Sequence, residues 1–253
     1  MILLFDIGNT HTHVGLGTRS RVVASHDFPT SDLAGGKRLA ALREFIGGRK
    51  PCGAALCSVV PAATATARAL AKEITGSPAL QLTPETIRGV GIRYPKPHTI
   101  GQDRLANAIA VHALFGAPSV VVDFGTAVTF DVVDRKGDYV GGIIAPGLAA
   151  MTDYLHEKTA LLPRIRIRPT RAIIGKNTEE AMLVGAVHGY RGLVRGLIGE
   201  LRAELGVRRL PVVATGGYAR LIARGVPEIS AVRPSLTLEG LRLLWWAHHR
   251  TPA

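Results

Sequence analysis

Hydrophobic positions open the chain in a pattern that predicts three neighbouring strands. Residues 2–7 form an apolar run that contains a single carboxylate, Asp6, and the polar turn Gly8-Asn9-Thr10 follows it. A short apolar run bounded by turn residues is typical of a buried strand. Residues 12–17 and 21–28 alternate well enough between apolar and polar positions to predict two further strands. We therefore expect an antiparallel meander at the start of the fold.

The rest of the first half alternates between helical and extended patterns. Asp32 is a suitable helix cap, and Pro61 stands where a second helix would begin. The predicted elements are helices over 33–46, 61–74 and 105–115, a strand over 54–60, and a loop rich in proline and glycine over 83–101.

The pattern restarts after Gly116-Ala117-Pro118. Its predicted elements are strands over 119–124, 128–133, 139–144 and 211–214, and helices that follow Gly147 and cover 178–205 and 236–249. Each half opens with a strand, an acidic turn and two more strands, and helices follow in both. This order predicts an α/β protein. We expect an N-terminal domain over 1–116 and a C-terminal domain over 117–253.

Composition narrows the class of protein. The chain has 253 residues, of which 47% are hydrophobic and 20% charged, and this excludes a wholly disordered chain. Only Cys52 and Cys57 occur, which excludes a disulfide scaffold and favours a cytoplasmic location. The longest uncharged stretch, 105–122, is broken by Asn107 and Pro118, so we expect no membrane helix.

The formal net charge of +12 is the unusual feature of the composition. Arginines at 164, 166 and 168 alternate with isoleucines, and this period of two predicts an edge strand with all three arginines on one face. Such a face is either a solvated surface or a stripe for a phosphate backbone. Aromatic residues make up only 5% of the chain, which speaks against nucleic-acid binding. Charge by itself does not decide between these interpretations.

Two similar turns carry the strongest candidate chemistry. Asp6 is followed by Gly8 and Thr10, and Asp123 by Gly125 and Thr126, each after an apolar run. A carboxylate at the end of a buried strand is costly without a cation or a hydrogen-bond donor. Glycine allows close approach to a ligand, and backbone amides and hydroxyls donate to phosphate. Two such hairpins can hold the phosphates of a nucleotide between them, although each alone also fits a plain turn.

Two further segments add to this set. Gly101-Gln102-Asp103-Arg104 opens a predicted helix, where Asp103 could accept a proton and Arg104 could bind an anion, or the two could form a surface pair. Thr215-Gly216-Gly217 joins a strand to a helix and offers a flat surface for a purine or ribose, or a simple turn. A metal site at His11 and His13 is a further alternative. The chain has neither a Walker A sequence nor a G-x-S-x-G nucleophile elbow.

Taken in order, these segments resemble the type III pantothenate kinases of the acetate and sugar kinase, heat-shock ATPase and actin superfamily. The matching motifs are DIGNT at Asp6–Thr10, Tyr94-x-x-Pro97 leading into GQDR at Gly101–Arg104, DFGTAVTFD at Asp123–Asp131, GGIIAPG at Gly141–Gly147, IGKNTEEAM at Ile174–Met182 and ATGG at Ala214–Gly217. The resemblance implies two ribonuclease H-like (actin-like ATPase) domains with mixed sheets and a cleft between them. It also implies phosphorylation of the primary hydroxyl of pantothenate by ATP, which gives 4'-phosphopantothenate in the first step of coenzyme A biosynthesis.

The resemblance also assigns roles to residues of this chain. Asp103 would be the general base, Asp6 would position Mg²⁺, and Asp123 would bind K⁺ or NH₄⁺. Thr178 would reach pantothenate across a homodimer interface. The implied ATP-binding residues are Asp6, Ile7, Gly8, Asn9, Thr10, His11, Thr12, His13, Thr126, Gly216 and Gly217. The implied pantothenate-binding residues are Tyr94, Gly101, Gln102, Asp103, Arg104 and Thr178.

Two positions depart from the family pattern. His11 replaces a residue that is commonly Asn, and Gln102 stands where a small residue such as Ala or Thr is usual. Two other functions are alternatives to pantothenate phosphorylation: a kinase for another small acceptor, and a nucleic-acid-associated transcriptional accessory protein. The GQDR and GGIIAPG matches speak against the first of these alternatives, and the low aromatic content speaks against the second.

Overall fold

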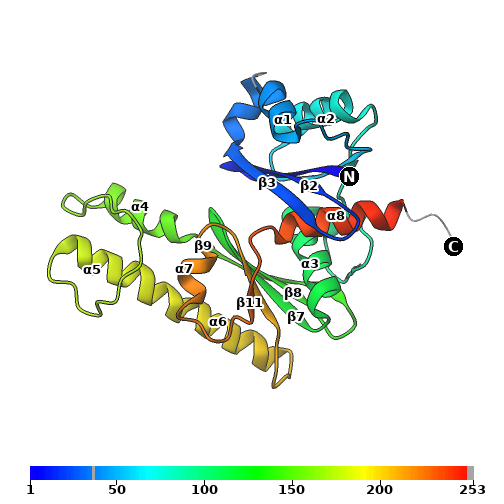
Figure 1. Cartoon of the computed structure of the whole chain (residues 1–253). Coiled ribbons are helices and arrows are strands. Elements are labelled where there is room, and N and C mark those ends of the chain that lie inside the picture. Colours follow the sequence, from blue (N-terminus) through cyan, green and yellow to red (C-terminus); the bar gives the residue numbers. More distant parts are fainter. Residues whose placement is uncertain (36–37, 250–253) are drawn as a thin grey trace. The chain divides into compact units, whose positions relative to one another are not determined.

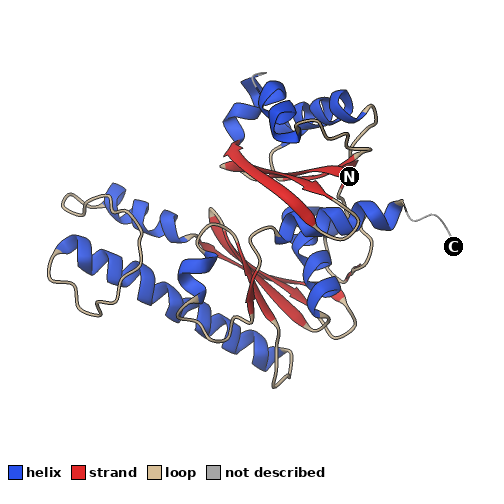
Figure 2. Cartoon of the chain, viewed as in Figure 1, coloured by secondary structure: helices blue, strands red, loops and turns tan. Residues whose placement is uncertain are grey.

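The computed structural model describes residues 1–35 and 38–249, and its helices and strands confirm the α/β class (Figure 2). Contacts divide the chain into two compact units. Unit 1 comprises Met1–Ala117, Arg135–Val140 and Ser235–Ala253, and unit 2 comprises Pro118–Asp134 and Gly141–Pro234. These units group residues by their contacts and are not a test of domain boundaries. The two predicted domains, 1–116 and 117–253, therefore stay a prediction.

Unit 1 contains a five-stranded sheet in the order β3-β2-β1-β4-β5. Its strands β2 and β3 are labelled in Figure 1. The antiparallel pairing of β1 with β2 and of β2 with β3 confirms the predicted meander. β4 joins β1 in parallel, which buries β1 between two neighbours. The strands are β1 (Ile2–Ile7), β2 (His11–Gly17), β3 (Val22–Pro29), β4 (Ala54–Ser58) and β5 (Leu80–Gln81).

The two faces of this sheet have different roles. Leu3, Phe5 and Ile7 of β1 belong to a hydrophobic core with residues of the helices α1 and α2. Side chains alternate along a strand, so Leu4 and Asp6 point to the opposite face. α8 contacts β1, β2 and β4 there, and α3 contacts β4. The helical elements of unit 1 are η1 (Thr30–Gly35), α1 (Arg38–Ile46), α2 (Pro61–Thr75), η2 (Pro97–Thr99), α3 (Gln102–Phe115) and α8 (Leu236–His248).

Helices α3 and α8 pack against each other at very short range. A Cβ atom on Gly240 would lie 2.0 Å from the carbonyl oxygen of Ala106, so only glycine fits at this crossing. In the same interface the buried Thr237 hydroxyl donates to the amide oxygen of Asn107 at 3.0 Å. Helix α8 therefore holds α3 along much of its length, and this support extends to the start of α3.

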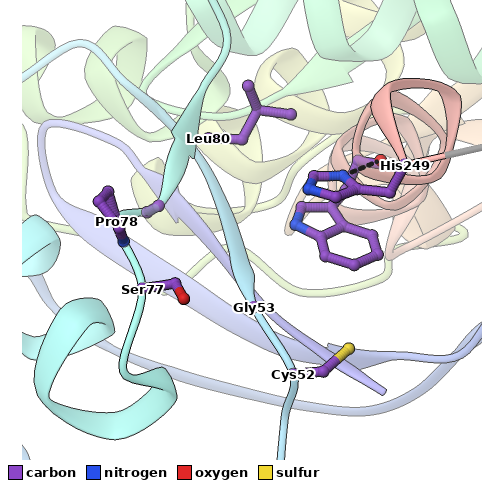
Figure 3. A pocket seen from close by; sticks show the side chains of 8 residues that line it. Cys52, Gly53, Ser77, Pro78, Leu80 and His249 are labelled. Carbon is purple, nitrogen blue, oxygen red and sulfur yellow. Dashed lines mark hydrogen bonds between the residues drawn. The ribbon is translucent and has the colours of Figure 1, made fainter.

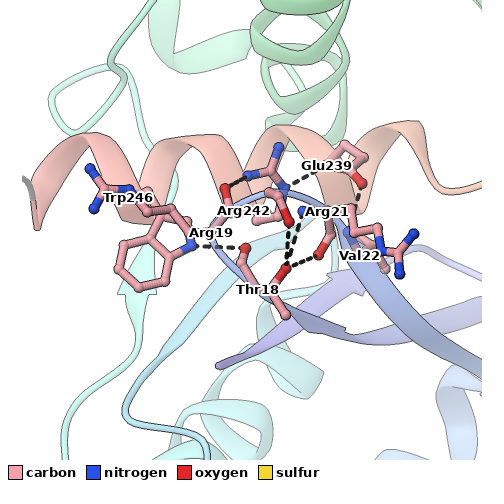
Figure 4. Close-up of polar contacts among 8 residues, drawn as sticks. Thr18, Arg19, Arg21, Val22, Glu239, Arg242 and Trp246 are labelled. Carbon is pink, nitrogen blue, oxygen red and sulfur yellow. Dashed lines mark hydrogen bonds and ion pairs between the residues drawn. The ribbon is translucent and has the colours of Figure 1, made fainter.

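Polar contacts also tie α8 to the β2–β3 turn (Figure 4). Glu239 pairs with Arg242 at 2.5 Å and accepts the amide of Val22 at 2.7 Å. The indole Nε1 of Trp246 donates to the carbonyl of Thr18 at 3.0 Å. Arg242 is only 4% exposed, so this ion pair is shielded from solvent and breaking it would leave a buried charge.

The second sheet has the strand order β11-β10-β7-β8-β9-β6. β7 and β8 form an antiparallel hairpin, and β10 pairs with β7 in parallel. β6 and residues 138–140 of β9 group with unit 1, and the other strands with unit 2. The strands are β6 (Gly91–Ile92), β7 (Ser119–Phe124), β8 (Ala127–Val133), β9 (Asp138–Pro146), β10 (Val212–Thr215) and β11 (Ala231–Val232).

The helices of unit 2 confirm most of the predicted pattern. The helix predicted over 178–205 is present as α5 (Thr178–Val184) and α6 (Tyr190–Glu204), joined by a π-helical turn at Gly185–Gly189. The remaining helices are α4 (Leu148–Lys158) and α7 (Ala219–Ala223). No helix in the described part of the chain is long and apolar enough to span a membrane.

The edge strand predicted from the arginine–isoleucine alternation is wrong. Residues 159–177, all described, have no regular secondary structure. Arg164 lies 3.6 Å from Asp153 and Arg168 lies 3.7 Å from Glu179, while Ile165 is buried in a small apolar cluster. The alternation therefore reflects one anchored side chain between solvated arginines, since no neighbouring strand supplies hydrogen bonds to this segment.

Candidate functional site

The turn between β1 and β2 presents backbone groups at an exposed tip. The Gly8 amide donates to the carbonyl of His11 at 3.0 Å, which closes the turn. Asn9, Thr10 and His11 are exposed. An exposed turn of this kind, with glycine and successive backbone amides, suits the oxygens of a phosphate chain.

Thr30 holds this turn through two hydrogen bonds. Its hydroxyl donates to the carbonyl of Gly8 at 2.7 Å, and its amide donates to the carbonyl of Thr10 at 3.0 Å. The Thr12 hydroxyl lies 3.0 Å from the Thr30 hydroxyl and is buried. Ile7 is likewise buried in the core, so Ile7 and Thr12 support the turn with their side chains and can offer a ligand only backbone atoms.

Asp6 lies at the end of β1 on the face toward α3. The buried thiol of Cys57, on the neighbouring β4, donates to its Oδ1 at 3.3 Å. Burial is the main cause that raises the pKa of Asp6 to about 6; His13 lowers this pKa and the carboxylate of Asp103 raises it. Burial and both carboxylates also raise the pKa of Cys57, so the thiol stays protonated and remains a donor.

Asp103 lies in the first turn of α3. Its Oδ1 accepts the amide of Arg104 at 2.9 Å, and a Cβ on Gly101 would lie 2.5 Å from the same oxygen. Glycine at 101 therefore leaves room for the carboxylate. Burial raises the pKa of Asp103, and the amide and charge of Arg104 partly offset this rise. The result is a partly desolvated carboxylate close enough to Asp6 to raise the pKa of Asp6.

Arg104 lies beside one aromatic ring, Tyr139, which is close to a second, Tyr94. Its guanidinium carbon is 5.8 Å from the ring centre of Tyr139, and the rings of Tyr94 and Tyr139 are 6.2 Å apart. Tyr94 is exposed and Tyr139 is buried. Tyr139 was not among the predicted site residues, although an aromatic residue just before the Gly141-Gly142 pair was a signal in the sequence.

Unit 2 brings a second set of predicted residues together. Thr215 pairs with Asp123 across β10 and β7, so Gly216 follows directly beside the acidic turn. Gly216 has φ of +87°, and a Cβ there would lie 2.6 Å from Asp123 Oδ1. Gly147 packs against the same turn, where its Cβ would lie 2.2 Å from the Thr126 carbonyl oxygen. Thr126 and Gly217 are exposed beside them.

Thr178 stands apart from this second set. It is exposed at the first position of α5, after Asn177, whose side chain accepts the amide of Glu180 at 2.9 Å. Among the described contacts, none joins Thr178 to the turn at Asp123. The pocket in Figure 3, which Cys52, Leu80, Trp245 and His249 help to line, contains none of the predicted site residues.

The carboxylates fit a nucleotide-bound magnesium better than a metal site built by the protein alone. No group of three or more His, Cys, Asp or Glu side chains in the described residues could hold a metal ion. His13 bonds to Asp27 at 2.7 Å through Nδ1, which engages half of the alternative histidine pair. Mg²⁺ in phosphoryl-transfer sites takes one or two carboxylates and otherwise phosphate oxygens and water. Asp6, beside the amide-rich turn, matches this requirement.

Comparisons with known proteins agree with this geometry. Solved structures with similar folds include a conserved protein of the Baf family of transcriptional activators from Campylobacter jejuni, with a TM-score of 0.63 and 18% identity over 98% of this chain and 99% of that one. Another is the activator of 2-hydroxyisocaproyl-CoA dehydratase from Clostridium difficile with bound ADPNP, with a TM-score of 0.54 and 12% identity over 100% and 98% of the two chains. At such identities the likeness concerns the fold alone, and it confirms the predicted actin-like ATPase fold.

Sequence relatives are much closer. Type III pantothenate kinases are 48% identical in Akkermansia muciniphila, over 95% of this chain and 96% of that protein, and 44% identical in Methylacidiphilum infernorum, over 96% and 87%. The family model for type III pantothenate kinase matches residues 2–200. This match covers the β1–β2 turn, the start of α3 and the turn at Asp123. The chain therefore belongs to the type III pantothenate kinase family.

Proposed function

We propose that the protein transfers the γ-phosphate of ATP to the primary hydroxyl of pantothenate and forms 4'-phosphopantothenate, in the first step of coenzyme A biosynthesis. The observation that carries this proposal is the pair of acids in unit 1. Asp6 ends β1 beside an amide-rich turn, and Asp103 opens α3 beside Arg104. One carboxylate thus lies at a phosphate-binding turn and the other is available to a hydroxyl group.

The proposed roles follow from what phosphoryl transfer requires. Such reactions depend mainly on positioning and on neutralising the charge of the transferred group. Backbone amides of residues 9–11 donate to phosphate oxygens, since the Gly8 amide closes the turn. Asp6 would hold a Mg²⁺ ion, which would neutralise phosphate charge. Asp103 accepts the proton of the pantothenate hydroxyl. Arg104, held beside Tyr139, binds the pantothenate carboxylate, with Tyr94, Gly101 and Gln102 around it.

We propose further nucleotide-binding residues in unit 2. Thr126, Gly216 and Gly217 contact ATP, and Asp123 binds K⁺ or NH₄⁺. Their grouping around one turn supports this assignment. Carboxylate and carbonyl oxygens are the usual ligands of hard cations.

For Asp123→Ala we expect loss of activation by monovalent cations. The variant lacks the charged oxygen ligand, so its rate in K⁺ should fall at least about tenfold, to the level measured with a large organic cation as the only monovalent ion, because a charge-assisted contact is typically worth roughly 1.5–3 kcal/mol. Initial rates across a K⁺ titration provide the measurement, and Asp153→Ala, in the exposed pair with Arg164, is the matched control. An unchanged K⁺ response would remove Asp123 from the cation site.

We also propose a homodimer formed through unit 2. Large apolar side chains are exposed there, which is unusual for a free surface. They include Tyr154 at 61%, Leu161 at 89% and Ile174 at 71% exposure, and Ile174 precedes Thr178 by only four residues. A second copy of the chain on this surface would cover them and bring Thr178 to the partner's pantothenate site.

The double variant Leu161→Lys with Ile174→Lys should be monomeric. Two charges at an apolar interface lose its hydrophobic contribution and add a desolvation cost. Sedimentation velocity measures the change, and Leu114→Lys, at another exposed leucine (48%), should leave the dimer intact. A wild-type monomer, or a double variant that still dimerises, would contradict this interface.

The test of the proposed function is a coupled assay of ADP release by the purified protein. Pantothenate is compared with a sugar and with a small carboxylic acid, in Mg²⁺ with K⁺ or NH₄⁺. Absence of pantothenate-dependent ADP release would overturn the proposal, and a faster rate with another acceptor would reassign the substrate.

We further propose a cytoplasmic location without a membrane or nucleic-acid partner, supported by two cysteines that are both free thiols.

A further inference from the structure

The carboxyl end of β4 contacts one candidate acid of unit 1, Asp6, and the residue directly before the other, Gln102. In the pairing of β4 with β1, Cys57 is opposite Asp6 and Ser58 is opposite Ile7. The Cys57 side chain is fully buried, and its thiol donates to Asp6 Oδ1 at 3.3 Å. The thiol therefore fixes one oxygen of Asp6, and the other oxygen takes no part in this bond.

The next residue of β4 reaches the start of α3. The Ser58 amide donates to the side-chain oxygen Oε1 of Gln102 at 2.9 Å. The Gln81 amide group approaches the same oxygen at 3.5 Å. A backbone N–H can only donate, so the Gln102 side chain must place its oxygen, not its nitrogen, against β4. Gln102 is thereby occupied as a link between two elements.

Ser58 cannot readily release this link. Its hydroxyl is held by the Val60 amide at 3.1 Å and by the Thr64 hydroxyl at 2.7 Å. The backbone around Ser58 is therefore fixed by the start of α2 as well as by β1. Gln102 is the residue directly before Asp103, so a fixed Gln102 limits how far the Asp103 backbone can move.

We propose that the carboxyl end of β4 is a positioning element, in which Ser58 and Gln102 hold Asp103 and Cys57 holds Asp6. The inference rests on the proposed function and deepens it by assigning Cys57 and Gln102 as positioning residues. The charge of Asp103 acts on Asp6 as a like charge, so the two carboxylates repel each other, and links to a common strand oppose their separation. A displacement of about 1 Å can cost roughly 100-fold in rate, so a fixed separation has catalytic value.

The first arm of the test uses Gln102→Met and Gln102→Glu. Methionine keeps the length of the side chain and removes the acceptor, whereas glutamate keeps an acceptor for Ser58. Helix α3 remains held by α8 through the contacts at Ala106 and Asn107, so the methionine variant should fold. We expect Gln102→Met to lower kcat about 10- to 100-fold, with KM for ATP within about twofold of the wild type.

Amide hydrogen exchange at Ser58 is the readout that does not depend on activity. It should be slow in the wild type and in Gln102→Glu, and at least about tenfold faster in Gln102→Met, because a lost bond of about 1.4 kcal/mol corresponds to a factor of ten. An unchanged kcat in the methionine variant, or unchanged exchange at Ser58, would overturn the role of Gln102. Wild-type protein without pantothenate kinase activity would instead overturn the proposed function. In that case amide exchange at Ser58 would still test the bond between Ser58 and Gln102.

The second arm tests Cys57 by calorimetry of Mg·ATP binding. Cys57→Ser keeps a donor for Asp6 and should bind within about twofold of the wild type, whereas Cys57→Ala should bind about tenfold more weakly, as expected for loss of a hydrogen bond to a charged group. Equal affinities of the serine and alanine variants would overturn the role of Cys57. Thermal unfolding of both variants checks that a change in affinity does not follow from a general loss of structure.

Discussion

Asp103→Asn is expected to lower kcat by about two to four orders of magnitude, the range typical for loss of a positioned general base. Asparagine has nearly the same shape and can still accept the Arg104 amide, so the start of α3 should be preserved. What it cannot do is take a proton from a hydroxyl group. The initial rate of phosphopantothenate formation gives kcat. Calorimetry gives the Kd for ATP, which should stay within about twofold of the wild-type value.

Glu73→Gln is a suitable control for this variant, since Glu73 is an exposed acid paired with Arg43 in unit 1. Retention of turnover in Asp103→Asn would remove Asp103 as the base.

The pH dependence of kcat in the wild type is a further test of this base. Burial raises the pKa of Asp103, and the base must be ionised, so kcat should begin to fall on the acidic side at a higher pH than for an ordinary aspartate.

Asp6→Asn is expected to abolish measurable turnover and to stabilise the ligand-free protein. The folded pKa of Asp6 is about 6, above the unfolded value of 3.8, so the native state binds a proton more tightly than the unfolded state. Ionising Asp6 therefore costs folding free energy as the pH rises from about 4 to 6. Asparagine removes this cost, which amounts to at most about 3 kcal/mol at 1.36 kcal/mol per pKa unit.

Urea unfolding of the ligand-free wild type and of Asp6→Asn at several pH values measures this effect. The variant should be the more stable protein at pH 8, and the difference should close as the pH falls through 6 toward 4. A variant that is less stable at pH 8 would show that the Asp6 carboxylate is satisfied by its surroundings. Asp27→Asn, at an exposed acid of the same sheet, should show no comparable gain.

Much of the fold and of the candidate site could be predicted from local pattern. The meander at residues 2–28, the turns after Asp6 and Asp123, and the start of α3 near Asp103 follow from periodicity and turn residues. Such signals lie within a few residues of each other, so a single sequence contains them. The family motifs then predict a common function for these segments, without any knowledge of their contacts.

What could not be predicted depends on register between distant segments. The bond from Cys57 to Asp6 exists because β4 pairs with β1 in one particular register, and a shift of one residue would turn the thiol to the other face. The bond from Ser58 to Gln102 likewise joins a strand end to a helix start 44 residues away. The edge strand predicted from the arginine–isoleucine alternation is wrong for a related reason, because a strand also needs a neighbouring strand to pair with.

The packing of α8 has a consequence for how the protein is made. Unit 1 is assembled from the first 117 residues, from residues 135–140 and from a helix that is synthesised only after all of unit 2. A nascent chain that has emerged as far as α3 still exposes the face of β1, β2 and β4 that α8 covers, together with the α3 surface around Ala106. The helix bearing Asp103 therefore gains its final support late in translation. Until then, that apolar face is available to chaperones and to other unfinished chains.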